Sequence, residues 1–138
     1  MSGLGAYEDH ALLVLRVLTG TFLVWGVADN IFSAARMDEF SAFLQHHGFP
    51  YPDVLAPVSV WAQCLCGLCF ITGVAIRWAG LLCAANFVVA VVMVDGKAGI
   101  RAAFPATMLV LVGLYLATRG AGRFAVSGMY RPSAFRED

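Results

Sequence analysis

The sequence predicts an all-α membrane protein: a bundle of four transmembrane helices, with a short amphipathic helix at the membrane interface in the first outer loop. Of its 138 residues, 60% are hydrophobic and 13% are charged, whereas an ordinary soluble domain has about 45–50% apolar and about 25% charged residues. A chain of this length has too little interior to hide so many apolar side chains from water. The balanced charge, nine basic against nine acidic residues, also argues against nucleic acid as a partner.

Four apolar segments are each long enough to cross a hydrocarbon layer of about 30 Å as a helix. They are continuously apolar and rich in Ala, Leu and Gly, unlike the alternating strands of a membrane barrel. A helix also satisfies its own backbone polar groups, as lipid requires. Residues 1–138 are treated as a single membrane domain, with spans expected at about residues 11–31, 54–76, 78–94 and 102–118.

The connections between these spans are short except for the first outer loop, residues 32–53. Apolar residues recur there at helical spacing, so we expect a short amphipathic helix lying at the interface. The following segment 48–52 should end that helix, because its two prolines disfavour continued helix. The tail, residues 120–138, begins with a Gly-Ala-Gly sequence that favours a helix stop. The residues at helical spacing in the loop are Phe40, Phe43, Leu44 and His47.

Two amides lie inside spans, where polar side chains are costly and often functional. Gln63 in the second span and Asn86 in the third each share a face with the small residues of their span. Both should therefore point into the bundle, near the middle of the membrane, whereas Leu82 should face lipid. Two interpretations are open: hydrogen bonds between helices, worth about 1 kcal/mol each, or a site for the headgroup of a small molecule such as a quinone.

The first span carries three further polar residues. Arg16 lies about one turn inside the span, where its side chain can reach back to lipid phosphates. Its place on the small-residue face favours an interior partner instead, so we expect it to face inward. Asn30, at the other end, shares that face, and Asp29 lies beside it. Asp29 either carries protons, binds a headgroup, or is a solvated residue at a helix end. The candidate ligand- or quinone-binding residues are Arg16, Asp29, Asn30, Gln63 and Asn86.

The cysteine and histidine patterns predict neither a metal site nor a haem site. Cys66 and Cys69 form a C-x-x-C sequence, but it lies in the middle of an uncharged span, and apolar surroundings keep a thiol protonated and inert. The alternative is that these two thiols exchange electrons with a quinone. His46 and His47 are adjacent, so a regular helix directs them about 100° apart and they cannot both bind one metal ion.

Several short motifs follow one another along the chain: Leu15-Arg16-Val17 with Gly20 and Gly26; Phe40-x-x-Phe43-Leu44 before Gly48-Phe49-Pro50-x-Pro52; Gly67 and Gly73 before Arg77; and Gly120-Ala121-Gly122-Arg123-Phe124. Their order resembles the DoxX family of small four-helix membrane proteins. The resemblance implies a four-helix integral membrane protein, and some relatives associate with quinone-linked or other redox complexes. Asp29 stands where the family often has Lys, and Gln63 where it often has Glu, so a Lys–Glu pair is not available within the membrane.

From these features we expect an accessory, non-catalytic membrane subunit of a bacterial respiratory or quinone-linked redox complex, which packs against partner helices and lines a quinone or lipid site. One alternative is a stand-alone protein that binds lipid or another apolar ligand, or that assists assembly. A second alternative is a small intramembrane thiol oxidoreductase. We expect no covalently bound cofactor; the ligand is a quinone or a lipid. The expected partners are membrane lipid and either another membrane protein or a second copy of the chain.

The distribution of basic residues predicts that both termini are cytoplasmic, in the bacterial inner membrane. Six of the nine Lys and Arg residues lie on or near the side of the termini, and basic residues concentrate on the cytoplasmic side. A reporter that is active only in the periplasm, fused to the C-terminus, should therefore be inactive, and a cytoplasmic reporter should be active there. The reverse pattern would contradict the orientation. The six residues are Arg16, Arg77, Arg119, Arg123, Arg131 and Arg136.

Overall fold

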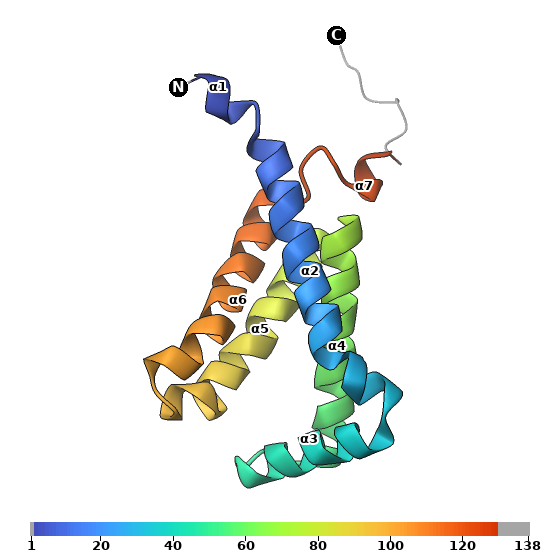
Figure 1. The fold of residues 1–138 in the computed structure, drawn as a ribbon, viewed down its shortest axis with the longest axis vertical. Coiled ribbons are helices and arrows are strands. Elements are labelled where there is room, and N and C mark those ends of the chain that lie inside the picture. The colour runs from blue at the N-terminus through green and yellow to red at the C-terminus, as the bar shows by residue number, and fades with distance from the viewer. Residues whose placement is uncertain (1, 130–138) are drawn as a thin grey trace.

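The computed structural model describes residues 2–129, which are almost entirely helical and contain no strand. Four helices are long and apolar enough to cross a membrane, so the predicted all-α, four-helix membrane fold is confirmed (Figure 1). Arg131 and Arg136, which entered the orientation argument, lie outside the described residues. The long helices are α2 (Glu8–Phe32), α4 (Pro52–Thr72), α5 (Ile76–Met93) and α6 (Ile100–Arg119), and the short ones are α1 (Ser2–Gly5), α3 (Ala34–His46), the 3₁₀ turn η1 (Asp95–Lys97) and α7 (Val126–Met129).

The boundary between the second and third spans differs from the prediction. Helix α4 ends at Thr72, not near Ile76, and Ile76 is instead the first residue of α5. Gly73 causes the break: its φ of 80° is left-handed, and its N–H closes the helix by donating to the carbonyl of Cys69. Glycine adopts this conformation without the steric cost that a side chain brings. Apolar composition runs through the break unchanged, so hydropathy alone does not reveal it.

The bundle consists of two helix pairs. Helix α2 packs along α4, and α5 packs along α6; these are the two most extensive interfaces of the described chain. A smaller contact between α4 and α5 joins the pairs. Figure 1 shows the pairs close together at the end where α2 begins and α6 ends, and spread apart toward the opposite end, where α3 lies.

Each helix pair is held by a contact between two glycines. A Cβ atom built on Gly20 of α2 would lie 2.5 Å from the carbonyl oxygen of Gly67 on α4, and one built on Gly67 would lie 2.7 Å from the carbonyl oxygen of Gly20. Gly80 of α5 and Gly113 of α6 face each other in the same reciprocal way. Small residues let membrane helices approach closely and gain van der Waals contact. Both contacts lie in the half of the bundle that holds the termini, so the helices are pinned there.

An ion pair joins the two ends of the chain on the same side of the bundle. Arg119 Nη2, at the end of α6, lies 2.8 Å from Glu8 Oε1, at the start of α2. Both side chains are largely exposed, so this pair adds little stability. It does show that the beginning of the first span and the end of the fourth lie on one side, as four spans require.

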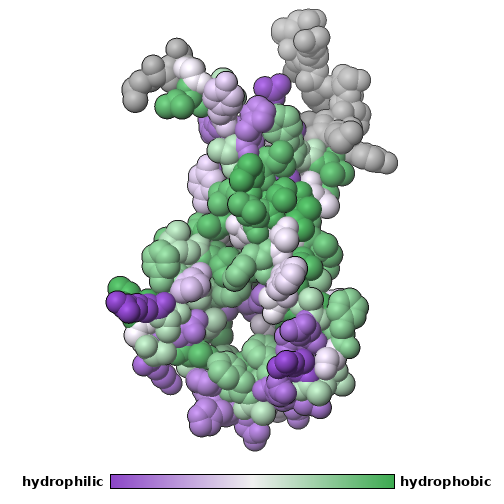
Figure 2. All heavy atoms as spheres, viewed as in Figure 1, coloured by the Kyte–Doolittle hydropathy of each residue, from purple (hydrophilic) through white to green (hydrophobic). Residues whose placement is uncertain are grey.

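Helix α3 forms in the outer loop where the sequence predicts one. It begins after Ser33, whose Oγ accepts a hydrogen bond from the N–H of Arg36, and it contacts α2 and α4. Its buried residues are Ser41 and Leu44, and the Ser41 hydroxyl donates to the carboxylate of Asp53 in the first turn of α4. Figure 2 shows hydrophobic residues over the middle of this face of the molecule and hydrophilic residues gathered toward both ends.

Replacing Gly20 with Ala should destabilise the protein. The added methyl group meets the backbone of α4, which cannot move aside as a flexible side chain can, and such overpacking costs about 1–3 kcal/mol. That cost exceeds the roughly 1 kcal/mol that Ala gains over Gly as a helix former. Unfolding by a denaturing detergent in mixed micelles, followed by circular dichroism, measures the difference. Gly26→Ala on the same helix is the matched control, because its nearest neighbour, Gln63 Nε2, lies 3.4 Å away and accommodates a methyl group. Equal stability of the two variants would contradict the pinning contact.

Candidate functional site

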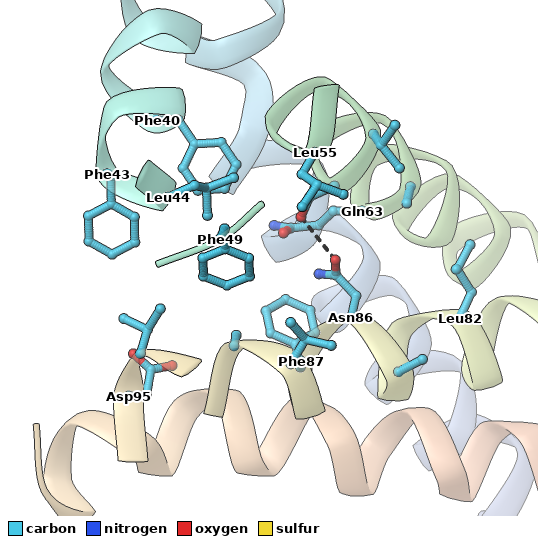
Figure 3. A pocket seen from close by; sticks show the side chains of 17 residues that line it. Phe40, Phe43, Leu44, Phe49, Leu55, Gln63, Leu82, Asn86, Phe87 and Asp95 are labelled. Carbon is cyan, nitrogen blue, oxygen red and sulfur yellow. Dashed lines mark hydrogen bonds between the residues drawn. The ribbon is translucent and has the colours of Figure 1, made fainter. Parts of the chain in front are cut away.

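A cavity of about 540 Å³ opens between α3, α4 and α5, where the two helix pairs spread apart (Figure 3). Figure 2 shows the surface hollowed in this region, between the lower end of α5 and α3. We call it the main cavity. Its wall is mostly apolar, and its lining residues are Phe40, Phe43, Leu44, Phe49, Leu55, Val58, Ser59, Ala62, Gln63, Leu82, Ala85, Asn86, Phe87, Val89, Ala90, Val94 and Asp95.

The polar residues of the main cavity meet on its inner wall, where α4 faces α5. The Ser59 hydroxyl donates to Asn86 Oδ1 over 2.9 Å, and Figure 3 shows the Asn86 amide directed from α5 toward α4. Gln63 Nε2 donates to the backbone carbonyl of Leu23 over 3.3 Å. Both amides are partly buried and point toward the bundle interior, as their helix faces predict. An amide has two N–H donors and one carbonyl acceptor, so each of the two amides has further groups that can bond to another molecule.

Four aromatic rings and one carboxylate stand out among the other residues of the wall, most of which are aliphatic. Phe40 and Phe43 come from α3, Phe49 from the segment after it, and Phe87 from α5 (Figure 3). Asp95 lies at the end of the third span. Followed along α5, it is at the opposite end of the cavity from the amides. The cavity is thus amphipathic: Gln63 and Asn86 lie near the middle of α4 and α5, Phe87 lies beside Asn86, and Asp95 lies just after the end of α5.

A second, smaller cavity of about 190 Å³ lies between α2, α3 and α4. We call it the side chamber. It has a larger polar share than the main cavity, and the two have the lining residues Phe40, Ser59 and Gln63 in common. The side chamber is lined by Gly26, Val27, Asn30, Phe40, Ser59, Val60 and Gln63.

The candidate residues of the first span have three different surroundings. Asn30 lines the side chamber, and its Nδ2 donates to the carbonyl of Arg36 over 3.1 Å. Asp29 is exposed and lines neither cavity. Arg16 is buried and lies away from both cavities. The structure therefore brings together Asn30, Gln63 and Asn86 and separates the other two from them.

Arg16 is 1% exposed and bonds only to backbone carbonyls among the described residues. Its Nε donates to Phe70 O over 3.0 Å and its Nη2 to Ile71 O over 3.2 Å, at the end of α4. Its Nη1 donates to Ala121 O and Phe124 O over 2.7 and 2.8 Å, in the loop after α6. The last carbonyls of a helix lack donors within the helix, and the guanidinium of Arg16 supplies these donors for Phe70 and Ile71. Arg16 thus has the interior partner that its helix face favours.

The cysteines lie in the core, away from both cavities. Cys66 is buried and its Sγ is directed at the carbonyl of Ala79, 3.4 Å away, while Cys69 is partly buried. All four cysteines are free thiols. Within residues 2–129, no group of three or more His, Cys, Asp or Glu side chains is placed to hold a metal ion.

Leu82, which the sequence places toward lipid, is exposed, and it also lines the main cavity. The sequence interpretation missed the aromatic wall contributed by the outer loop. The sequence did contain a signal for Ser59: it lies four residues before Gln63, on the same face of the helix, and this spacing predicts that both point toward the same site.

These observations define a small multi-pass membrane protein whose four-helix bundle holds an amphipathic, ligand-sized cavity. The family model for DoxX matches residues 11–96. Because this match covers more than half of the chain, the protein belongs to the DoxX family. No match was found among curated proteins or among solved structures.

Replacing Arg16 with Leu should lower stability strongly and loosen the loop after α6. The substitution leaves several buried carbonyls without donors, and each such group costs about 1–3 kcal/mol. Limited proteolysis should then cut near residues 121–124, and detergent-induced unfolding should shift to milder conditions. Arg36→Leu is the control, because Arg36 forms only an exposed pair with Glu39 and should change stability by less than about 1 kcal/mol. A fully resistant loop in the Arg16 variant would contradict this role.

Proposed function

We propose that this protein binds a membrane-soluble amphiphile, a quinone or a lipid, in its main cavity, and that it serves as a non-catalytic membrane subunit beside partner helices. The main cavity is the single observation that carries the proposal. Its volume of about 540 Å³ lies within the roughly 300–1,000 Å³ of small-molecule sites. Such sites combine a mainly apolar wall with a few convergent polar groups, and Ser59, Gln63 and Asn86 are groups of that kind.

The position of the cavity supports a ligand that arrives from the bilayer. Its walls belong to α4 and α5, two candidate spanning helices, and to α3 at their end. A ligand with a polar end and an apolar body gains on both counts, because its body covers apolar wall and its polar end bonds the amides. Burial of apolar surface alone would not select this position over the surrounding lipid, since lipid chains are equally apolar. The amides therefore supply the selectivity.

The chemistry of the wall favours binding over catalysis. Asp95 is the one ionisable residue among those that line the main cavity. General acid–base or nucleophilic catalysis needs a positioned titratable or nucleophilic group near the reacting atoms. The thiols of Cys66 and Cys69, which the oxidoreductase alternative requires, line neither cavity. A subunit that holds a ligand for a partner is therefore better supported than an independent enzyme.

The exposed surface fits a protein that is surrounded by lipid and partner helices. Along α6 the exposed large side chains include Phe104, Leu111 and Tyr115. In the inner membrane, with both termini cytoplasmic as proposed, the main cavity lies in the outer half of the bilayer. The role as a subunit of a redox complex rests on this apolar surface and on the family resemblance.

Replacing Gln63 or Asn86 with Leu should weaken ligand retention. Loss of one neutral hydrogen bond costs about 1 kcal/mol, so each variant should retain roughly fivefold less ligand. The measurement is mass spectrometry of the quinones and lipids that co-purify with the protein from native membranes. Thr107→Leu is the matched control, because Thr107 is exposed on α6 and bonds only within its own helix. Equal ligand content in all three variants would contradict the proposal.

A further inference from the structure

The side chamber has a larger polar share than the main cavity. Three of the residues that line it, Asn30, Ser59 and Gln63, carry amide or hydroxyl groups. Asn30 and Gln63 each use one N–H in the bonds described above. An amide has two N–H donors and a carbonyl acceptor, so each keeps one donor and its oxygen for a further partner. The chamber can both donate to and accept from a ligand.

The side chamber and the main cavity are adjacent. Phe40, Ser59 and Gln63, from α3 and α4, line both of them, so the same side chains face both spaces. Gly26 keeps the side chamber open from the α2 side, because a Cβ atom there would already lie 3.4 Å from Gln63 Nε2. Any longer side chain at this position would extend toward the amide.

No residue that lines the side chamber is ionisable. An anionic headgroup removed from water needs a cation beside it, and the lining supplies none. Arg16 lies away from both cavities, and the side chain of Arg36 pairs with Glu39 over 3.1 Å. The chamber therefore disfavours a phosphate and suits an uncharged group.

The volume limits the size of that group. The side chamber measures about 190 Å³, and an apolar protein cavity of about 150 Å³ holds a benzene molecule. One six-membered ring, or a glycerol-sized group, thus fits, whereas the remainder of an amphiphile must lie in the larger, apolar space beside it.

We infer that the side chamber takes the compact, uncharged headgroup of an amphiphile whose tail lies in the main cavity, and that it selects carbonyl- or hydroxyl-bearing headgroups over phosphate-bearing ones. This inference rests on the proposed function, since it assumes that the main cavity holds the tail. It makes Asn30 and Gly26, which do not line the main cavity, determinants of headgroup specificity.

A competition experiment with four compounds of one chain length tests the inference. A photoreactive diazirine alkane is crosslinked to the purified full chain in detergent, and the competitors are an alkylated benzoquinone, a long-chain alcohol, its phosphate monoester and the parent alkane. The quinone and the alcohol should compete at least about tenfold better than the phosphate. Better competition by the quinone than by the alcohol identifies a ring headgroup, and the reverse identifies a lipid hydroxyl.

Variants assign the effect to the side chamber. Gly26→Leu fills the chamber and Asn30→Leu removes its amide, so in each the quinone and the alcohol should compete no better than the alkane. Thr21→Leu, at an exposed position of α2 that lines neither cavity, should keep the wild-type preference. Circular dichroism establishes that each variant is folded, and Asn30→Leu keeps the test decisive if Gly26→Leu fails to fold.

The outcomes separate this inference from the proposed function. If all four compounds compete equally well at sites mapped to the main cavity, the cavity binds tails but the headgroup inference is wrong. The same holds if the phosphate competes best. If the probe labels the protein outside the main cavity and no compound competes, both the inference and the proposed function are wrong.

Discussion

Two glycine-to-glycine contacts govern the shape of this bundle. Gly20 meets Gly67 between α2 and α4, and Gly80 meets Gly113 between α5 and α6, with backbone directly against backbone. Both contacts lie in the half of the molecule that holds the termini, and Arg16 ties α2, α4 and the loop after α6 together in the same half. The glycine contacts hold each pair together, while Arg16 and the short connection between α4 and α5 join the two pairs at this end. The pairs separate toward the other end, and the main cavity occupies the space between α4 and α5.

Both interior amides line a cavity and join helices as well. Hydrogen bonds of this kind between helices are common in membrane bundles. Here Gln63 reaches a backbone carbonyl and Asn86 accepts from Ser59, so both keep donors and acceptors for another molecule. Gln63 and Asn86 lie near the middle of α4 and α5, whereas Phe40, Phe43 and Phe49 come from α3 and the segment after it. A ligand that bonded the amides at one end would be oriented as well as bound.

Hydropathy and the spacing of small residues were sufficient to predict four spans, the helix in the outer loop, the burial of Arg16 and the inward direction of the two amides. They were insufficient wherever the answer depends on distance between helices. Periodicity shows which side of a helix faces its neighbours, but not how far apart the neighbours lie, so it did not reveal that the exposed Leu82 also lines a cavity. The partners of Arg16 could not be predicted either. Ala121 is 105 residues away along the chain, and it contacts Arg16 only through its backbone carbonyl.

Ala121 and Phe124 bond to Arg16 only through their backbone carbonyls, and this has a consequence for the evolution of the loop after α6. A guanidinium that bonds to main-chain oxygens places no demand on the side chains that follow them. Ala121 and Phe124 can be exchanged without loss of the contact, provided that the loop keeps its backbone path. Substitutions at these positions should therefore show no correlation with the residue at position 16 among relatives. One of the longest-range contacts of the molecule would then be invisible to any method that infers proximity from paired sequence changes.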